Sequence, residues 1–276
     1  MSLQTKRNSL AAIEDCLKRD GALGEEEALL VLGDRTIPLS GLLAVTDRLR
    51  RRHSGNRIRL CSIINAKSGF CSEDCSFCAQ SSRYSTGVTH YPLLAVERLS
   101  VAAVEAASTG AGEFSIVTSG AALRSEKELT VLEQALRSIR QSSANLQRCA
   151  SLGRVTPGQL YRLKQAGLEC FHHNLETSRR FFPRICTTHT YDDRVKMVRT
   201  AKRAGFRVCS GGIFGMGEAD RDRVALAMEL RELDVDSVPL NFLHPIPGTP
   251  LEAAGFLTPE ICLRTVSYTH LTLPTN

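Results

Sequence analysis

Three cysteines, Cys71, Cys75 and Cys78, lie within eight residues in a CxxxCxxC pattern. Cysteine thiolates are the usual ligands of iron–sulfur clusters, and four of them normally hold one cluster. Three thiolates at this spacing can each bind one iron of a cubane, which leaves the fourth iron without a protein ligand. We therefore interpret this segment as a metal-cluster loop with one iron open to a substrate.

Three other uses of these thiols compete with that interpretation. A structural zinc site takes four nitrogen or sulfur ligands, typically as two separated pairs, and no histidine lies close to this triplet in the sequence. A thioredoxin-type CxxC fits Cys75 and Cys78 but leaves Cys71 unexplained. Lone cysteines are often buried as small hydrophobes, which is a poor account of three thiols among polar residues. The pattern favours a cluster without identifying its substrate.

Alternating strands and helices are predicted to position this loop. Strands joined by single helices are typical of a parallel sheet built from βαβ units. The predicted strands are 58–64, 114–118, 146–152, 168–174, 207–214 and 237–242, and the predicted helices are 95–108, 125–139, 157–166, 191–204, 220–232 and one that starts at Pro259. This pattern predicts an α/β fold of the (β/α)8 type, incomplete at about six units, with the loop at the carboxyl end of its first strand. An open doubly wound sheet is the competing architecture.

The pattern also divides the chain into segments. Apolar residues at helical spacing predict an N-terminal helical layer over 1–56, and a single barrel domain is expected over 57–265. The final segment, 266–276, ends the last predicted helix abruptly and resembles the translation of a sequencing adapter. We expect this tail to be non-native and the natural chain to continue past about residue 265.

Composition narrows the class of protein. The chain has a net charge of +6, but its basic residues are interspersed with acidic ones and it has no Trp. Few aromatic residues are available for stacking on bases, so nucleic acid is not an expected partner. No leader-like N-terminus and no apolar run of about 18 residues is visible, so we expect a cytoplasmic protein without a membrane partner. In that compartment thiols stay reduced, and the cysteines expected to be purely structural are Cys16, Cys61, Cys170 and Cys262.

Longer strings around the cysteines resemble a known family. The CxxxCxxC motif with Phe77 before its last cysteine is similar to the signature of the radical S-adenosylmethionine (SAM) superfamily. The strings within 65–87, 173–178 and 208–218 resemble the biotin synthase family of that superfamily, and the likeness covers about residues 25 to 265. Another radical enzyme of the same branch, a maturase or a mutase, is the alternative. A non-catalytic iron–sulfur protein is the alternative from a different class.

The resemblance implies a reaction and its cofactors. The reaction is sulfur insertion into dethiobiotin to give biotin, in which a 5′-deoxyadenosyl radical abstracts hydrogen from unactivated carbons. The implied cofactors are a 4Fe–4S cluster on the three loop cysteines, SAM, and an auxiliary iron–sulfur cluster, 2Fe–2S or a variant, that donates the sulfur. A reduced flavodoxin- or ferredoxin-type electron donor and a homodimer are also implied. Because the cofactors carry the chemistry, we assign no catalytic acid or base.

The resemblance further assigns binding residues. It places Phe77, Glu176 and Ile213 at SAM, with Glu176 at the ribose, and it places Asn174 and Asn241 at the ureido ring of the substrate or at the cofactor. Asn174 and Glu176 are two residues apart, so a strand would put them on one face. The alternative for each is an ordinary polar group at a strand end.

Two further cysteines are assigned to the auxiliary cluster. By resemblance Cys149 and Cys209, each on a predicted strand, are ligands of that cluster, although buried thiols without a metal are the alternative. Ser115 stands where the resemblance implies a third cysteine, and the implied arginine ligand would lie beyond Thr265. Cys186 is therefore a candidate replacement ligand.

Overall fold

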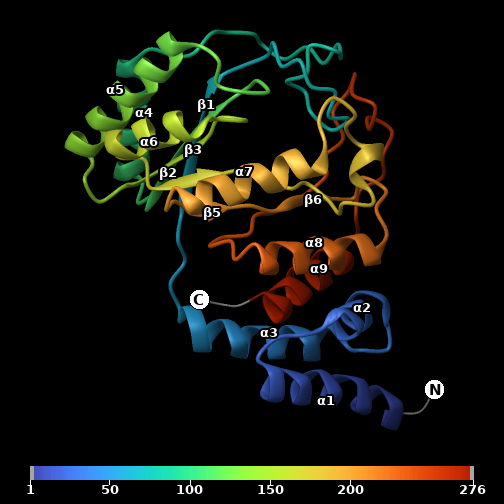
Figure 1. Ribbon diagram of the computed structural model, residues 1–276. Helices are drawn as coiled ribbons and strands as arrows, with labels where there is room; N and C mark the ends of the chain where they lie inside the picture. Colours follow the sequence, from blue (N-terminus) through green and yellow to red (C-terminus); the bar gives the residue numbers. More distant parts are fainter. Residues whose placement is uncertain (1–2, 274–276) are drawn as a thin grey trace.

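A parallel sheet forms the centre of the computed structural model, which describes residues 3–273 (Figure 1). Its five strands pair in the order β1-β2-β3-β4-β5, and a second parallel pair joins β6 to β7. The strands are β1 (Cys61–Lys67), β2 (Glu113–Thr118), β3 (Gln147–Ser151), β4 (Cys170–His172), β5 (Arg207–Cys209), β6 (Gly212–Phe214) and β7 (Leu240–Phe242). Sequential parallel order is that of a (β/α)8-type barrel, here not closed by the described strands. The predicted barrel architecture is confirmed, and the doubly wound alternative, which requires a reversal of strand order, is wrong.

Helices separate successive strands as the sequence predicts, except that none lies between β5 and β6. They are α4 (Val96–Ser108), α5 (Glu126–Ser142), α6 (Pro157–Ala166), α7 (Tyr191–Arg203), α8 (Asp220–Glu232) and α9 (Pro259–Thr272), with a short 3-10 turn, η1 (Phe182–Arg184), before α7. Side-chain caps fix where several of them start. Thr156 and Gln159 form a capping box at α6, for example, and Thr190 and Asp193 form one at α7. None of the helices over residues 3–273 is both long and apolar enough to cross a membrane.

One predicted strand, 207–214, is two strands in the structure. β5 ends at Cys209 and β6 begins at Gly212 because the chain passes very close to the segment before β7 at this point. A Cβ atom built on Gly211 would lie 2.0 Å from the carbonyl oxygen of Pro239. Only glycine fits this approach. Isolated parallel bridges, Cys209 with Ser237 and Glu176 with Gly212, still connect the two sheets across the break.

Three helices precede the sheet and pack beneath α8 and α9 (Figure 1). They are α1 (Leu3–Asp20), α2 (Glu25–Gly33) and α3 (Leu39–Ser54). Their apolar faces share a second hydrophobic cluster with α8 and α9, apart from the cluster around the sheet. The buried guanidinium of Arg264 in α9 donates to the carbonyl oxygens of Val31 (3.1 Å) and Ile37 (2.7 Å). α9 thus ties the N-terminal helices to the barrel.

The predicted end of the last helix near residue 265 is wrong. α9 continues to Thr272, and Tyr268 is fully buried, with its hydroxyl donating to the carbonyl oxygen of Arg223 at 2.7 Å. Helical spacing places Tyr268 and Leu271 on the side of α9 that faces the N-terminal helices and α8. The non-native origin of 266–276 stays a prediction, and residues 274–276 lie outside the described part of the chain.

Asp222 is a buried carboxylate in the first turn of α8. It accepts hydrogen bonds from the Ser178 hydroxyl (2.6 Å), Arg180 Nε (3.0 Å) and the Ala219 N–H (2.9 Å). Burial raises the pKa of this carboxyl, but the hydrogen bonds outweigh burial and hold the pKa below its ordinary value. The charged form of Asp222 therefore fastens the segment after β4 to α8.

We expect Asp222→Asn to lower the free energy of unfolding by about 1.5–3 kcal/mol at pH 7, which is typical of hydrogen bonds to a charged group. Because the pKa is lower in the folded state, the stabilisation is complete above the unfolded-state value of about 3.9 and is lost as the pH falls through the folded-state value. Urea unfolding of the parent and the variant between about pH 7 and pH 3 measures this difference. A difference that does not shrink toward acid pH contradicts the assignment.

Candidate functional site

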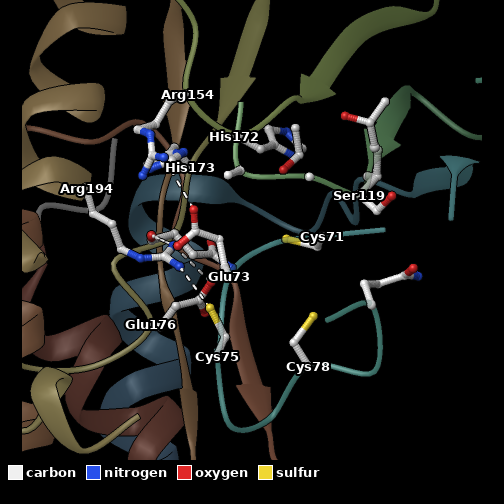
Figure 2. Close-up of a pocket in the computed structure, with 18 of the residues that line it drawn as sticks. Cys71, Glu73, Cys75, Cys78, Ser119, Arg154, His172, His173, Glu176 and Arg194 are labelled. Carbon is white, nitrogen blue, oxygen red and sulfur yellow. Dashed lines mark hydrogen bonds and ion pairs between the residues drawn. The ribbon is translucent and has the colours of Figure 1, made fainter. Parts of the chain in front are cut away.

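A cavity of about 620 Å³ runs along the inner face of the sheet. At the carboxyl ends of the strands it is lined by residues such as Ser119 and Asn174, and at the amino ends by Cys61 and Glu113. Figure 2 shows the polar side chains that converge on the carboxyl end. This end carries the active sites of barrel enzymes.

Cys71, Cys75 and Cys78 all line this cavity, and Figure 2 shows their sulfur atoms directed toward a common space. Backbone hydrogen bonds curl the loop, from the Cys78 N–H to the Cys75 carbonyl (3.0 Å) and from the Ser82 N–H to the Cys71 carbonyl (2.8 Å). All three are free thiols. Burial raises the pKa of Cys78, so a thiolate there requires a nearby positive charge, such as a metal. The donor set and its placement fit a cluster held by three cysteines.

Two carboxylates between the cysteines attach the loop to the segment before α7. Asp74 accepts from the backbone N–H groups of Thr187 (2.9 Å) and Thr188 (3.2 Å). Glu73 pairs with Nδ1 of His189 at 2.6 Å and with Arg154 at 3.3 Å. The sequence analysis did not single out these acids, although their position inside the cysteine motif was a usable signal.

Arg194, in the first turn of α7, connects several parts of the site. It donates to the Asn174 carbonyl (2.8 Å) and to Nε2 of His189 (3.0 Å), pairs with Glu176 at 3.4 Å, and lies 3.9 Å from the Cys75 sulfur. Arg194 was not predicted from the sequence as a site residue. The capping motif that starts α7 at the carboxyl end of the sheet was the signal available for it.

Glu176 is buried in the cavity wall and lies beyond the end of its strand. β4 ends at His172, and Glu176 has a positive φ of 72°, so the predicted strand 168–174 is shorter than expected and does not carry Glu176 and Asn174 on one regular face. Burial raises the pKa of Glu176, and Arg194 opposes that effect. Among the described residues, Glu176 Oε2 has no hydrogen-bond partner. A buried acceptor in this state fits a ligand that donates hydroxyl groups.

The other predicted binding residues separate into two groups. Phe77, Asn174 and Asn241 line the cavity. Ile213 is not among the described residues that line it, and its backbone N–H donates to the carbonyl of Glu176 at 2.8 Å. Its contact with the site is therefore through the backbone of Glu176.

The cysteines predicted for an auxiliary cluster do not form one group. Cys209 lines the cavity, whereas Cys186 lies beside the metal-cluster loop, 3.8 Å from the Cys75 sulfur and 3.2 Å from Asp74. These contacts do not support Cys186 as a partner of Cys149. The expectation that Cys170 is a plain structural thiol is also not supported, because the ligand atoms of Cys149, Cys170 and His172 all lie within 4.8 Å of one another.

The sequence matches the model of the radical SAM superfamily over residues 66–230, which includes the metal-cluster loop. The biotin synthase of Trichlorobacter lovleyi is 50% identical over 92% of this chain and 77% of the relative. The chain belongs to the biotin synthase family. Two further biotin synthases are similar to the chain. That of Geobacter sulfurreducens is 47% identical over 93% of this chain and 78% of the relative, and that of Acetivibrio thermocellus is 45% identical over 96% of this chain and 82% of the relative.

Two solved structures share the fold. Methylornithine synthase superimposes with a TM-score of 0.79 at 19% identity, covering 95% of this chain and 77% of that one. The hydrogenase maturase of Carboxydothermus hydrogenoformans gives 0.79 at 16%, covering 96% and 63%. These likenesses concern the fold alone, and the sequence relatives place the chain in the biotin synthase family rather than with the mutase or the maturase.

Membership of the biotin synthase family brings with it a 4Fe–4S cluster, SAM and an auxiliary iron–sulfur cluster. The three loop thiols fit the first cluster, and the unpartnered oxygen of Glu176 fits a hydroxyl-bearing cofactor such as SAM. The zinc and thioredoxin interpretations of the loop are wrong for a member of this family.

Proposed function

We propose that this chain converts dethiobiotin to biotin, with Cys71, Cys75 and Cys78 as the ligands of its 4Fe–4S cluster. The observation that carries the proposal is the convergence of these three thiols on one deep cavity, in a chain that is 50% identical to a biotin synthase. When bound, the cluster and SAM supply the one-electron cleavage chemistry that activates unreactive C–H bonds. The protein contributes binding, orientation and a shaped cavity.

Glu176 and Arg194 are proposed to bind and orient SAM. The buried Oε2 of Glu176 accepts from ribose hydroxyls, and the ion pair with Arg194 keeps the carboxylate in position. Arg194 also holds His189 and the Asn174 carbonyl, so one side chain fixes the geometry of three groups around the cavity. A site restrained in this way loses little order when the cofactor binds.

Asn174 and Asn241 are proposed to bind the ureido ring. Asn174 Oδ1 accepts from the Gly211 N–H at 3.2 Å, and Asn241 Nδ2 donates to the Gly212 carbonyl at 3.3 Å. The backbone at the start of β6 thus binds the side-chain oxygen of Asn174 and the side-chain nitrogen of Asn241. The remaining donor of Asn174 and acceptor of Asn241 complement the carbonyl and N–H groups of a urea.

Anaerobic turnover tests the proposed reaction. The purified chain, reconstituted with iron and sulfide and reduced in the presence of SAM and dethiobiotin, is expected to yield both 5′-deoxyadenosine and biotin. Formation of 5′-deoxyadenosine without biotin contradicts the substrate assignment and favours another radical reaction. Formation of neither product contradicts the enzymatic assignment as a whole.

We expect Glu176→Gln to weaken SAM binding about 10- to 100-fold, because it removes a charged acceptor whose hydrogen bonds are worth about 1.5–3 kcal/mol. Equilibrium binding of SAM to the reconstituted protein measures the change. Glu232→Gln, an exposed substitution on α8, is the matched control and is expected to leave the affinity unchanged. Equal affinities of the parent and Glu176→Gln would remove Glu176 from the cofactor site.

Three features remain proposals: the first two rest on the sequence resemblance, and the third rests on the sequence composition. They are a reduced flavodoxin- or ferredoxin-type electron donor, a homodimer, and a cytoplasmic location. The division into an N-terminal helical layer over 1–56 and a barrel domain over 57–265 is likewise a proposal. Sedimentation of the purified chain tests the dimer directly.

A further inference from the structure

A second group of metal-binding side chains lies inside the sheet, away from the metal-cluster loop. Cys149 on β3 and Cys170 and His172 on β4 bring their sulfur and nitrogen ligand atoms within 4.8 Å of one another. Both thiols are buried, with exposed fractions of 0% and 5%. Neither takes part in the contacts that hold the metal-cluster loop, so the proposed binding of SAM leaves this group unexplained.

Strand register explains why these residues meet. Cys149 is the direct partner of Cys170 across β3 and β4, and His172 is the direct partner of Cys209 across β4 and β5. Cys170 and His172 are two residues apart on β4, so they share one face of the sheet. His172 and Cys209 both line the cavity, which identifies that face as the inner one.

Ser115 on β2 lies next to Cys149 in the cross-strand row that Cys149 and Cys170 form. It pairs in register with Cys149 on β3, and its hydroxyl lies 3.3 Å from Nδ1 of His172. A hydroxyl in this position is a much poorer ligand for iron than a thiolate, which is the donor that iron–sulfur clusters use. Cys170, on β4 two strands from Ser115, places its thiol beside the same His172 ring. The inner face of the sheet therefore carries the thiols of Cys149, Cys170 and Cys209 even though β2 contributes a serine, with Cys61 farther along at the amino end of β1.

We propose that Cys149, Cys170 and Cys209 hold the auxiliary iron–sulfur cluster of this chain, with His172 as the fourth ligand. This inference rests on the proposed function, and it replaces Ser115 and an arginine by Cys170 and His172 in the ligand set. Imidazole is an established alternative to thiolate in iron–sulfur centres. The Ser115 hydroxyl orients the His172 ring through the contact at Nδ1, which leaves Nε2 as the ligand atom.

Iron analysis in a background without the first cluster isolates this site. The variant Cys71→Ala/Cys75→Ala/Cys78→Ala, reconstituted anaerobically, is expected to retain iron, sulfide and a thiolate-to-iron absorption band. Adding Cys170→Ala is expected to remove most of the retained iron, and adding His172→Ala is expected to shift the absorption and electron paramagnetic resonance spectra. Cys16→Ala, which removes a buried thiol from α1, is the matched control and is expected to retain the full signal.

Two outcomes would overturn the assignment. One is unchanged iron and spectra after Cys170→Ala in a protein whose far-ultraviolet circular dichroism matches the parent. The other is loss of the iron on Cys61→Ala but not on Cys170→Ala, which would move the site toward the amino end of β1. Failure of the proposed function gives a different result from failure of this ligand assignment. The first appears as an absence of 5′-deoxyadenosine from the parent reaction, and it leaves the iron count of the triple-alanine variant unchanged.

Discussion

Cys75→Ala is expected to reduce the formation of 5′-deoxyadenosine more than about 100-fold, since even changes around a metal ligand cost 10- to 100-fold. Cys75 is the central thiol of the metal-cluster loop and the one nearest to Arg194. By the proposed assignment, its loss would remove one of the three protein ligands of a cluster that has no fourth protein ligand. Iron content, the cluster absorption and the rate of anaerobic SAM cleavage measure the effect, and Cys262→Ala, a partly buried thiol on α9, is the matched control.

The neighbouring thiol makes a double variant necessary. The sulfur of Cys186 lies 3.8 Å from that of Cys75, so the single variant does not exclude Cys186 as a substitute ligand. Cys75→Ala/Cys186→Ala excludes that replacement, and its cleavage activity is expected to be at background. Parent-level cleavage by the double variant would contradict the assignment of the loop. A double variant at background beside a partly active single variant would identify Cys186 as the substitute.

Glu218→Ala is expected to lower the free energy of unfolding by about 3–5 kcal/mol, the usual cost of breaking a buried ion pair from one side. The Glu218 carboxylate accepts from the backbone N–H groups of Gly215 (2.9 Å) and Met216 (2.8 Å) and from Arg223 Nε (2.8 Å). Both charged side chains are buried. Truncation leaves a buried guanidinium without its main partner and the turn after β6 without its acceptor.

Urea unfolding followed by circular dichroism measures this loss. Asp220→Ala is the matched control, because Asp220 pairs with the same arginine at 3.3 Å but is partly exposed. Its expected cost is at most about 1 kcal/mol, as for surface ion pairs. Equal losses in the two variants would show that burial of the Glu218 pair is not the source of the stability.

Local patterns predicted the elements and the metal-cluster loop well. The predicted helices 157–166 and 220–232 match α6 and α8 residue for residue, because cap residues and apolar spacing act over a few neighbours. The three thiols of the loop are close in the sequence, so their spacing alone indicates that they bind the same metal cluster. Family strings then identified Glu176 and Asn174 as residues of the cavity.

These local patterns do not predict which residues pair across strands or between distant elements. Cys170 was predicted to be an ordinary buried thiol because nothing in the sequence states that it is the register partner of Cys149. Arg194 meets Glu176 only through the packing of α7 against the sheet. The break between β5 and β6 depends on the backbone approach at Gly211, and an apolar run does not reveal such an approach.

The length of the cavity along the strands has a consequence for the order of chemical events. One set of thiols lies beyond the carboxyl end of β1, and the other lies within β3, β4 and β5. Asn174, which lines the cavity, comes four residues after Cys170 and lies beyond the carboxyl end of β4. If both proposed ligand sets are right, a small heterocycle bound between them would have the radical-generating cofactors on one side and the sulfur donor on the other. Both stages of sulfur insertion could then take place on one bound molecule, without its release in between.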